Sequence, residues 1–341
     1  MVDAREQGPE RAEFVEGIFG RNTTPEEAAT ILVGVPWEAT TSYGRGTAAG
    51  PDAIFAASPQ LDLYDVELGR VDAAGIAMVT APDAFRRRAE RAAKSAEEVI
   101  SKFDGGRKPS RARLAEVNEA SRDVDAWVET EVGRWLEDDK LVGTVGGDHS
   151  VALGAIRAHA ARYEGLGVLQ FDAHADLREA YQGFLGSHAS VMHNVLAQTD
   201  VSLVSVGLRD LCEEEYQRCC DDPRVTALFD AELQRRALTG ESLYDIVMPY
   251  LDRLPGQVYV SFDIDGFDPS LCPHTGTPVP GGLNWAQAMF ILRTLGQSGR
   301  RVVGFDVCEV APGPRGEWDA NVGARLIYKL IGLCRGHWEG K

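Results

Sequence analysis

The chain has 341 residues, 44% hydrophobic and 26% charged, which is typical of a globular protein that can bury a sizeable sheet under helices. Its 52 acidic residues outnumber its 35 basic ones, and the net charge of −17 argues against nucleic acid as a partner and fits small cationic substrates, divalent metals or simply a soluble acidic surface. Its six cysteines form no CxxC pair and no segment is apolar enough for export or a membrane span, so we expect a cytoplasmic protein with reduced thiols and no membrane partner.

The N-terminal part divides into a polar extension and a first strand–helix unit. Residues 1–25 are interpreted as an extension, and Thr24 before Pro25 predicts a helix start. The remaining residues, 26–341, are expected to form a single domain. Its first elements are a buried strand from Ile31 to Val35 and a helix that Pro51 opens.

The rest of the chain predicts two helices and then a parallel sheet. Residues 84–140 are rich in Ala, Arg, Glu and Lys, and "FDGGRKPS" indicates an exposed connection between two helices. Short apolar runs then alternate with helical stretches: "LVGTVGG", "GVLQFDAH", "VSLVSVG", "QVYVSFDID" and "RVVGFDVCEV". Strands that are hydrophobic throughout are typical of a parallel sheet covered on both faces, so the expected fold class is α/β.

Polar residues cluster where these apolar runs end. In "LQFDAHADLRE", Asp172, His174 and Asp176 are two residues apart, so an extended backbone turns all three to one side. "SFDIDGFDPS" repeats this pattern, and "TVGGDHS" adds a third group of polar residues. Ligands bind outside the carboxyl ends of parallel strands, so one site built from several strand ends is predicted.

The residue types in these motifs indicate metal ligands. A set dominated by carboxylates suits Mn²⁺ or a similar ion better than a single zinc, which prefers nitrogen and sulfur. Six ligands are too many for one such ion, and two ions about 3.5–4 Å apart can ionise a water between them. The competing interpretation, in which each Asp caps a loop and each His is a satisfied polar residue, explains one motif more easily than three at equivalent positions. The six candidates are His149, Asp172, His174, Asp176, Asp263 and Asp265.

Three motifs, "GGDHS", "DAHAD" and "SFDIDGFDPS", resemble the metal-binding motifs of the ureohydrolase (arginase and agmatinase) family, in this order and spacing. The resemblance runs from about Ile31 to about Leu330. It implies a three-layer αβα arginase-like fold with a mainly parallel eight-stranded sheet, assembled as trimers or hexamers. It also implies that one ion is held by His149, Asp172, Asp176 and Asp263, and the other by His174, Asp172, Asp263 and Asp265.

The same resemblance implies catalytic and substrate-binding residues. His188 in "GSHASVM" matches a proton-shuttling histidine, and Glu309 in "GFDVCEVAP" matches the carboxylate that binds the guanidinium. Thr275 and Thr277 match substrate-proximal threonines. A surface-loop histidine, a plain salt bridge and two turn residues are the respective alternatives. The implied reaction is hydrolysis of a guanidino compound to urea and an amine by a metal-dependent enzyme.

The loop residues favour the agmatinase-like branch. Arg178 stands where arginases carry Asn, and His193 stands where agmatinases carry Arg. Agmatine is therefore the first expected substrate, followed by guanidine, guanidinobutyrate, guanidinopropionate or a biguanide. Two Mn²⁺ ions are expected, with Ni²⁺ as the alternative.

The sequence leaves three other classes of protein open. Gly44, Gly46 and Ala49 meet a loose dinucleotide-binding pattern, but no strand ends directly before Gly44. The chain could also be a metal-binding, non-catalytic subunit of a hetero-oligomer. A deacetylase-like enzyme would use similar strand-end ligands but hold one zinc ion.

Overall fold

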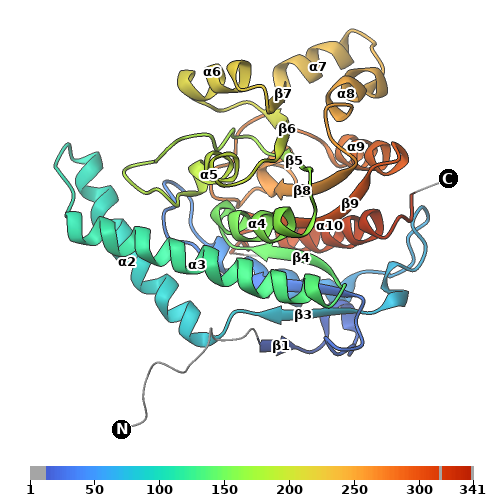
Figure 1. Cartoon of the computed structure of the whole chain (residues 1–341), viewed down its shortest axis with the longest axis horizontal. Coiled ribbons are helices and arrows are strands. Elements are labelled where there is room, and N and C mark those ends of the chain that lie inside the picture. The colour runs from blue at the N-terminus through green and yellow to red at the C-terminus, as the bar shows by residue number, and fades with distance from the viewer. Residues whose placement is uncertain (1–12, 315–316, 339–341) are drawn as a thin grey trace.

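A nine-stranded sheet forms the centre of the computed structural model, which describes residues 13–314 and 317–338 (Figure 1). The strand order is β1-β3-β2-β4-β9-β8-β5-β6-β7, and every neighbouring pair is parallel except β1 with β3. The strands are β1 (Glu13–Val15), β2 (Thr30–Val35), β3 (Ile76–Thr80), β4 (Leu141–Gly146), β5 (Leu166–Phe171), β6 (Ser202–Leu208), β7 (Val225–Phe229), β8 (Gln257–Asp263) and β9 (Arg301–Cys308).

Two helical layers cover the sheet, and each has its own apolar core. On one face lie α2 (Asp83–Asp104), α3 (Arg111–Glu137), α4 (Ala152–Arg162), α5 (Val191–Gln198) and α6 (Glu213–Asp221). On the other face lie α1 (Gly50–Ala57), α7 (Asp230–Leu238), α8 (Leu243–Leu251), α9 (Trp285–Gln297) and α10 (Trp318–Cys334). Within β5, Leu169 and Phe171 pack toward the second layer and Val168 toward the first, as the alternation of strand side chains requires.

The predicted three-layer, mainly parallel α/β architecture is confirmed, with three corrections. The sheet has nine strands rather than eight, because residues of the N-terminal segment add β1 antiparallel to β3. The helix expected at Thr24 is a single turn. It cannot continue because Ala29 N already donates to the carbonyls of Ala74 and Gly75, just before β3, and Thr30 begins β2. The strands β3 and β7 were not recognised in the sequence. Residues 1–12 of the predicted extension lie outside the described residues, and the boundary at residue 26 stays a prediction.

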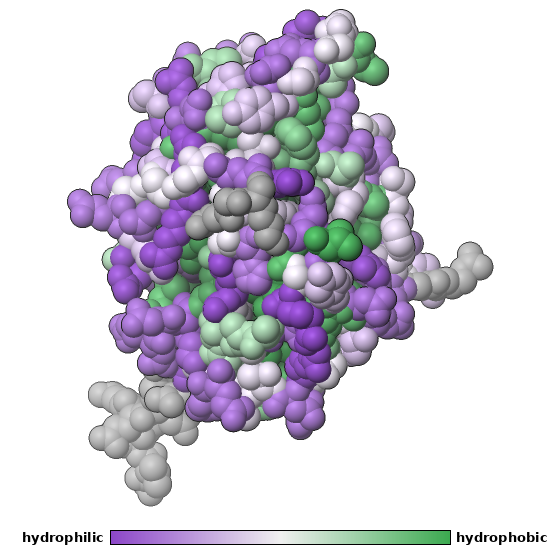
Figure 2. All heavy atoms as spheres, turned by 90° about the vertical axis from the view of Figure 1, so that its right-hand side faces the viewer, coloured by the Kyte–Doolittle hydropathy of each residue, from purple (hydrophilic) through white to green (hydrophobic). Residues whose placement is uncertain are grey.

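The surface of the described part is mixed in polarity. The face on the right of Figure 1 carries mostly polar side chains with small apolar groups between them (Figure 2). None of the helices within residues 13–314 and 317–338 combines the length and the apolar character needed to cross a membrane.

A buried histidine in α4 predicts an acid-sensitive fold. His159 is fully buried, and burial lowers its pKa to about 4, although a hydrogen bond to the carbonyl of Ala155 favours the charged form. An unfolded histidine titrates near pH 6.5. Below that pH the unfolded chain takes up a proton that the folded chain does not, so the free energy of unfolding is highest above pH 6.5 and falls as the pH falls toward 4. We expect His159 to account for roughly 2 kcal/mol of lost unfolding free energy between pH 7 and pH 5.

Urea denaturation of chelator-treated protein at the two pH values measures this loss. His159→Gln is expected to lose less stability than the wild type over the same interval, because glutamine takes up no proton. Equal losses in both proteins would contradict the assignment.

Candidate active site

Four adjacent strands bring the predicted ligands to one edge of the sheet. β4, β9, β8 and β5 are neighbours, and their carboxyl ends lie together because they are parallel. His149 opens a short 3-10 segment after β4, and Asp172 follows β5 directly. Asp263 ends β8, and Glu309 follows β9. The sheet order thus gathers residues that are up to 160 positions apart in the chain.

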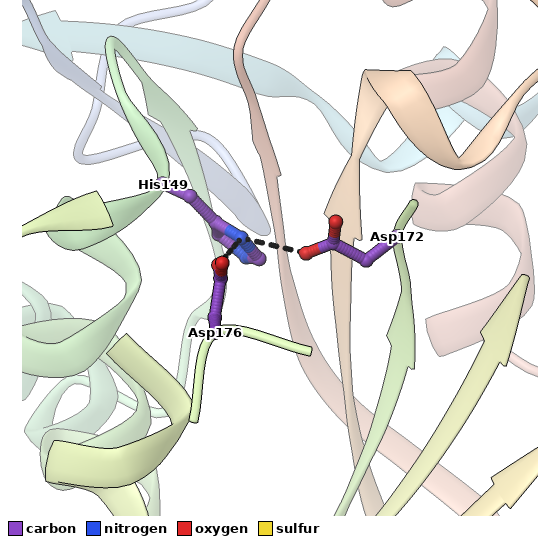
Figure 3. A group of neighbouring side chains, drawn as sticks. All are labelled: His149, Asp172 and Asp176. Carbon is purple, nitrogen blue, oxygen red and sulfur yellow. Dashed lines mark hydrogen bonds and ion pairs between the residues drawn. The ribbon is translucent and has the colours of Figure 1, made fainter. Parts of the chain in front are cut away.

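The first ligand group surrounds His149. Its Nδ1 lies 3.1 Å from Asp172 Oδ2, 3.0 Å from Asp176 Oδ2 and 3.5 Å from Asp263 Oδ2. Figure 3 shows the imidazole contacted by the carboxylates of Asp172 and Asp176, which approach it from different directions. All four residues are buried, so three acceptor groups converge on one imidazole nitrogen out of reach of bulk water.

The second group surrounds His174 and shares Asp172 with the first. His174 Nδ1 lies 3.0 Å from Asp265 Oδ2 and 3.6 Å from Asp172 Oδ1. Asp172 therefore turns one oxygen toward each histidine. Backbone N–H groups support this geometry, since His174 N donates to Asp172 Oδ1 and Asp265 N donates to Asp263 Oδ1.

The cluster holds more buried carboxylates than positive charges, and this shifts the pKa values of its members. Burial raises the pKa of Asp176 to about 7, with a further contribution from the charge of Asp172. Burial and the neighbouring carboxylates, first that of Asp265, raise the pKa of Asp263 well above its usual range. Although burial opposes it, the carboxylates of Asp265 and Asp172 raise the pKa of His174 to about 12.

This donor set fits divalent cations. Two imidazole nitrogens and the carboxylate oxygens form two compact groups, His149 with Asp172 and Asp176, and Asp172 with His174 and Asp265. Positive charge placed in each group would relieve the repulsion between buried carboxylates. Mixed imidazole and carboxylate donors are typical of sites for a first-row divalent ion such as Mn²⁺, whereas structural zinc sites are usually rich in thiolates.

Two site residues have left-handed backbone conformations. Asp176 has φ 54° and Glu309 has φ 62°, which is uncommon for residues other than glycine and tends to cluster at functional sites. The surrounding structure holds the Asp176 segment in place: His193 N donates to the Asp176 carbonyl, and Arg218 contacts the carbonyl of Leu177 and His193 Nδ1. Arg218 from α6 thus places a guanidinium beside the position where an agmatinase-like arginine was expected.

A cavity of about 140 Å³ opens onto the second group. His174, Asp176, His188 and Thr277 are the predicted site residues that line it, together with Ser42, Arg178, Tyr181, Ala189, Asp210 and Glu215. Nδ1 of His188 is buried without a hydrogen-bond partner in the described part of the chain. Burial and the positive charges of His174 and His149 lower the pKa of His188 to about 4. His188 is therefore a neutral imidazole at the mouth of the cluster.

Glu309 and Thr275 are buried away from the cavity, whereas Thr277 lines it. Glu309 is buried and does not line the cavity; its Oε1 accepts a hydrogen bond of 2.9 Å from His149 N. Burial, with the charge of Asp148, raises the pKa of Glu309 well above its usual range. Thr275 Oγ1 donates to the Glu309 carbonyl, and Thr277 Oγ1 lies 3.4 Å from Asp265 Oδ2.

Three features of the sequence have structural explanations outside the ligand set. The carboxylate of Asp148 accepts from the backbone of Ala39 and Ser150 and thereby caps the 3-10 turn that begins at His149. Arg178 forms an ion pair of 3.2 Å with Glu215, so it closes part of the cavity wall. The glycine-rich loop considered for dinucleotide binding instead packs beside the site, where Gly44 N donates to the Gly276 carbonyl.

Several polar residues in the strands below the ligands were missed in the sequence. Gln170 Nε2 donates to Asp172 Oδ2 at 2.8 Å, and Ser205 Oγ donates to Gln170 Oε1 at 2.7 Å. Ser261 and Asp306 lie beneath His149. Gln170 and Ser261 each stand two residues before a ligand and therefore share its strand face, which is the signal that could have identified them.

Comparisons with known proteins agree with the motif resemblance. The model of the arginase family matches residues 28–332. The N(1)-aminopropylagmatine ureohydrolase of Synechocystis sp. is 32% identical over 314 residues, which cover 91% of this chain and 90% of the relative. The agmatinase of Bacillus cereus is 30% identical over 294 residues, covering 84% of this chain and 85% of that protein.

The fold comparison points the same way. The structure of the agmatine ureohydrolase of Thermoplasma volcanium superposes with a TM-score of 0.71 at 26% identity and covers 92% of each chain. With the family model matching nearly the whole described sheet and its helices, this chain belongs to the arginase family.

Proposed function

We propose that this chain hydrolyses a guanidino compound to urea and an amine at a centre of two divalent ions. The observation that carries the proposal is the position of Asp172, whose two oxygens face two different histidines. A buried carboxylate in this position suits a bridge between two ions. The whole of residues 26–341 is proposed to form the catalytic domain, in a cytoplasmic trimer or hexamer.

The two ions are assigned to the two ligand groups. His149, Asp172, Asp176 and Asp263 would hold one, and His174, Asp172, Asp263 and Asp265 the other. Mn²⁺ is the first choice, because carboxylates outnumber imidazoles, and Ni²⁺ is the alternative. The chemistry that such a pair supplies is the acidification of a shared water near neutral pH.

The remaining residues bind the substrate and move a proton. The Glu309 carboxylate would accept hydrogen bonds from the guanidinium, and Thr277, which lines the cavity, would orient it. Thr275 holds the backbone of Glu309 and so acts through it. Nδ1 of His188 has no hydrogen-bond partner among the described residues, so it would be available to a proton, and a pKa near 4 would favour passing that proton on to the departing nitrogen.

A cationic guanidino amine fits the site best. The relatives named above are an agmatinase and an N(1)-aminopropylagmatine ureohydrolase, and both names specify guanidino amines. At the cavity rim, Asp210 is 68% exposed and can face a distal ammonium group. Agmatine is the default substrate, and an aminopropyl-extended agmatine is the second candidate.

Urea release from a panel of guanidines tests the proposal. The panel contains agmatine, aminopropylagmatine, guanidine, guanidinobutyrate, guanidinopropionate, a biguanide and arginine, each assayed with Mn²⁺, Ni²⁺ or a chelator. We expect metal-dependent urea release, with a guanidino amine preferred over arginine. Activity that appears only after mixing with another polypeptide would favour a non-catalytic subunit, and one tightly bound zinc per chain would favour a mononuclear hydrolase.

A further inference from the structure

A row of polar side chains crosses the sheet beneath the two ligand groups. The strand register pairs Thr144 of β4 with Asp306 of β9, Asp306 with Ser261 of β8, Ser261 with Gln170 of β5, and Gln170 with Ser205 of β6. Side chains at paired positions of a parallel sheet point to the same face. All five residues are at most 2% exposed, in strands that are otherwise almost entirely apolar.

Burying such a row costs free energy unless its members bond to one another. Ser205 donates to Gln170 Oε1, which fixes the amide so that Nε2 points to Asp172 Oδ2. Ser261 Oγ donates to Asp306 Oδ1 at 3.1 Å and lies 2.9 Å from His149 Nε2. The row thus contacts two ligands. Gln170 binds Asp172, which both ligand groups share, and Ser261 contacts His149 of the first group.

The direction of these bonds determines the tautomer of His149. Its Nδ1 faces the carboxylates and must be free of hydrogen to bind a cation, so the hydrogen resides on Nε2. Nε2–H can then donate to Ser261 Oγ only if the serine hydroxyl points elsewhere, and Asp306 Oδ1 accepts that hydroxyl. Asp306 therefore acts on the metal site through Ser261.

We propose that four residues of this row, Asp306, Ser261, Gln170 and Ser205, form a positioning layer that presets His149 and Asp172 for metal binding. Ser261 and Asp306 hold the His149 tautomer, and Gln170 holds the orientation of Asp172. The proposal rests on the metal centre of the proposed function but not on any particular substrate. Removing Ser261 affects the ion beside His149, whereas removing Gln170 affects both ions through the shared carboxylate.

Metal binding to the full chain, measured by isothermal titration with Mn²⁺ and by elemental analysis after dialysis, tests the proposal. We expect Ser261→Ala to weaken one of two binding steps by about 10- to 100-fold, and Asp306→Asn to weaken the same step less. Ser261→Thr keeps the hydroxyl and should restore the step. Gln170→Leu should weaken both steps.

The matched control is Thr30→Val, which removes a buried hydroxyl without a partner from β2 of the same sheet and should leave both steps unchanged. Thermal unfolding of the metal-free proteins shows whether a variant loses metal affinity because its fold is destabilised or because its ligands are misplaced. If Ser261→Ala does not fold, Asp306→Asn tests the row in its place. Wild-type affinity at both steps in Ser261→Ala and Asp306→Asn would overturn the positioning layer alone. A wild-type chain that binds no metal would overturn the proposed function with it.

Discussion

Asp172→Ala is expected to abolish the binding of both ions and to reduce urea formation by about 10³-fold or more, a loss of about 4 kcal/mol of transition-state stabilisation. The reason is geometric, because one oxygen of Asp172 faces His149 and the other faces His174. The substitution leaves two imidazoles without their common partner, so neither group keeps its set of donors. Elemental analysis gives the metal content, and the urea assay gives the activity.

Two single-group variants provide the comparison for Asp172→Ala. Asp176→Ala and Asp265→Ala each remove a carboxylate near only one histidine. Each is expected to retain about one ion per chain, and both should remain folded by circular dichroism. If Asp172→Ala retains two ions, or if all three variants lose the same amount of metal, the bridging role of Asp172 is wrong.

The strands that position the site were recognisable in the sequence because helices cover both of their faces. A strand covered by helices on both faces is apolar throughout, and β4, β5, β6, β8 and β9 appear as such runs. The two missed strands are short, and in β7 only Val225 and Leu228 are buried, so this edge strand carries a weak apolar signal. β1 has only three residues, none of them buried, and its place in the sheet depends on pairing with β3.

The spacing of the ligands within each motif was predictable from the sequence, whereas the contact between ligands of different motifs was not. A spacing of two residues within an extended segment sends side chains to one side, which is a local property of the chain. The order β4-β9-β8-β5 is a property of the whole sheet, and it places β9, the last strand in the sequence, between β4 and β8. Only this order brings Glu309 to the backbone of His149.

The polar row illustrates what alternation can and cannot reveal. Gln170 and Ser261 each precede a ligand by two residues, so local spacing places them on the correct face. Asp306 gives no such sign, because its link to His149 passes through Ser261 on a neighbouring strand. Cross-strand register, which no single run encodes, is what makes it part of the site.

Glu309→Gln is expected to reduce kcat/KM for the preferred guanidine by about 10²- to 10³-fold while both ions stay bound. The loss corresponds to about 3–4 kcal/mol, the size expected when a buried cation loses its charged partner. Glutamine keeps an acceptor for the backbone N–H of His149, so the local fold should survive. What it lacks is the negative charge that pairs with a planar, forked cation.

A neighbouring buried carboxylate serves as the control for Glu309→Gln. Glu38 is buried and accepts hydrogen bonds from the backbone of Gly46 and Ala48, whereas Glu309 accepts from the backbone of the ligand His149. Glu38→Gln should lower thermal stability more than it lowers kcat/KM, whereas Glu309→Gln should do the reverse. If Glu309→Gln retains kcat/KM within about threefold of the wild type, guanidinium recognition must be assigned to another carboxylate, and Asp210 at the cavity rim is the next to replace.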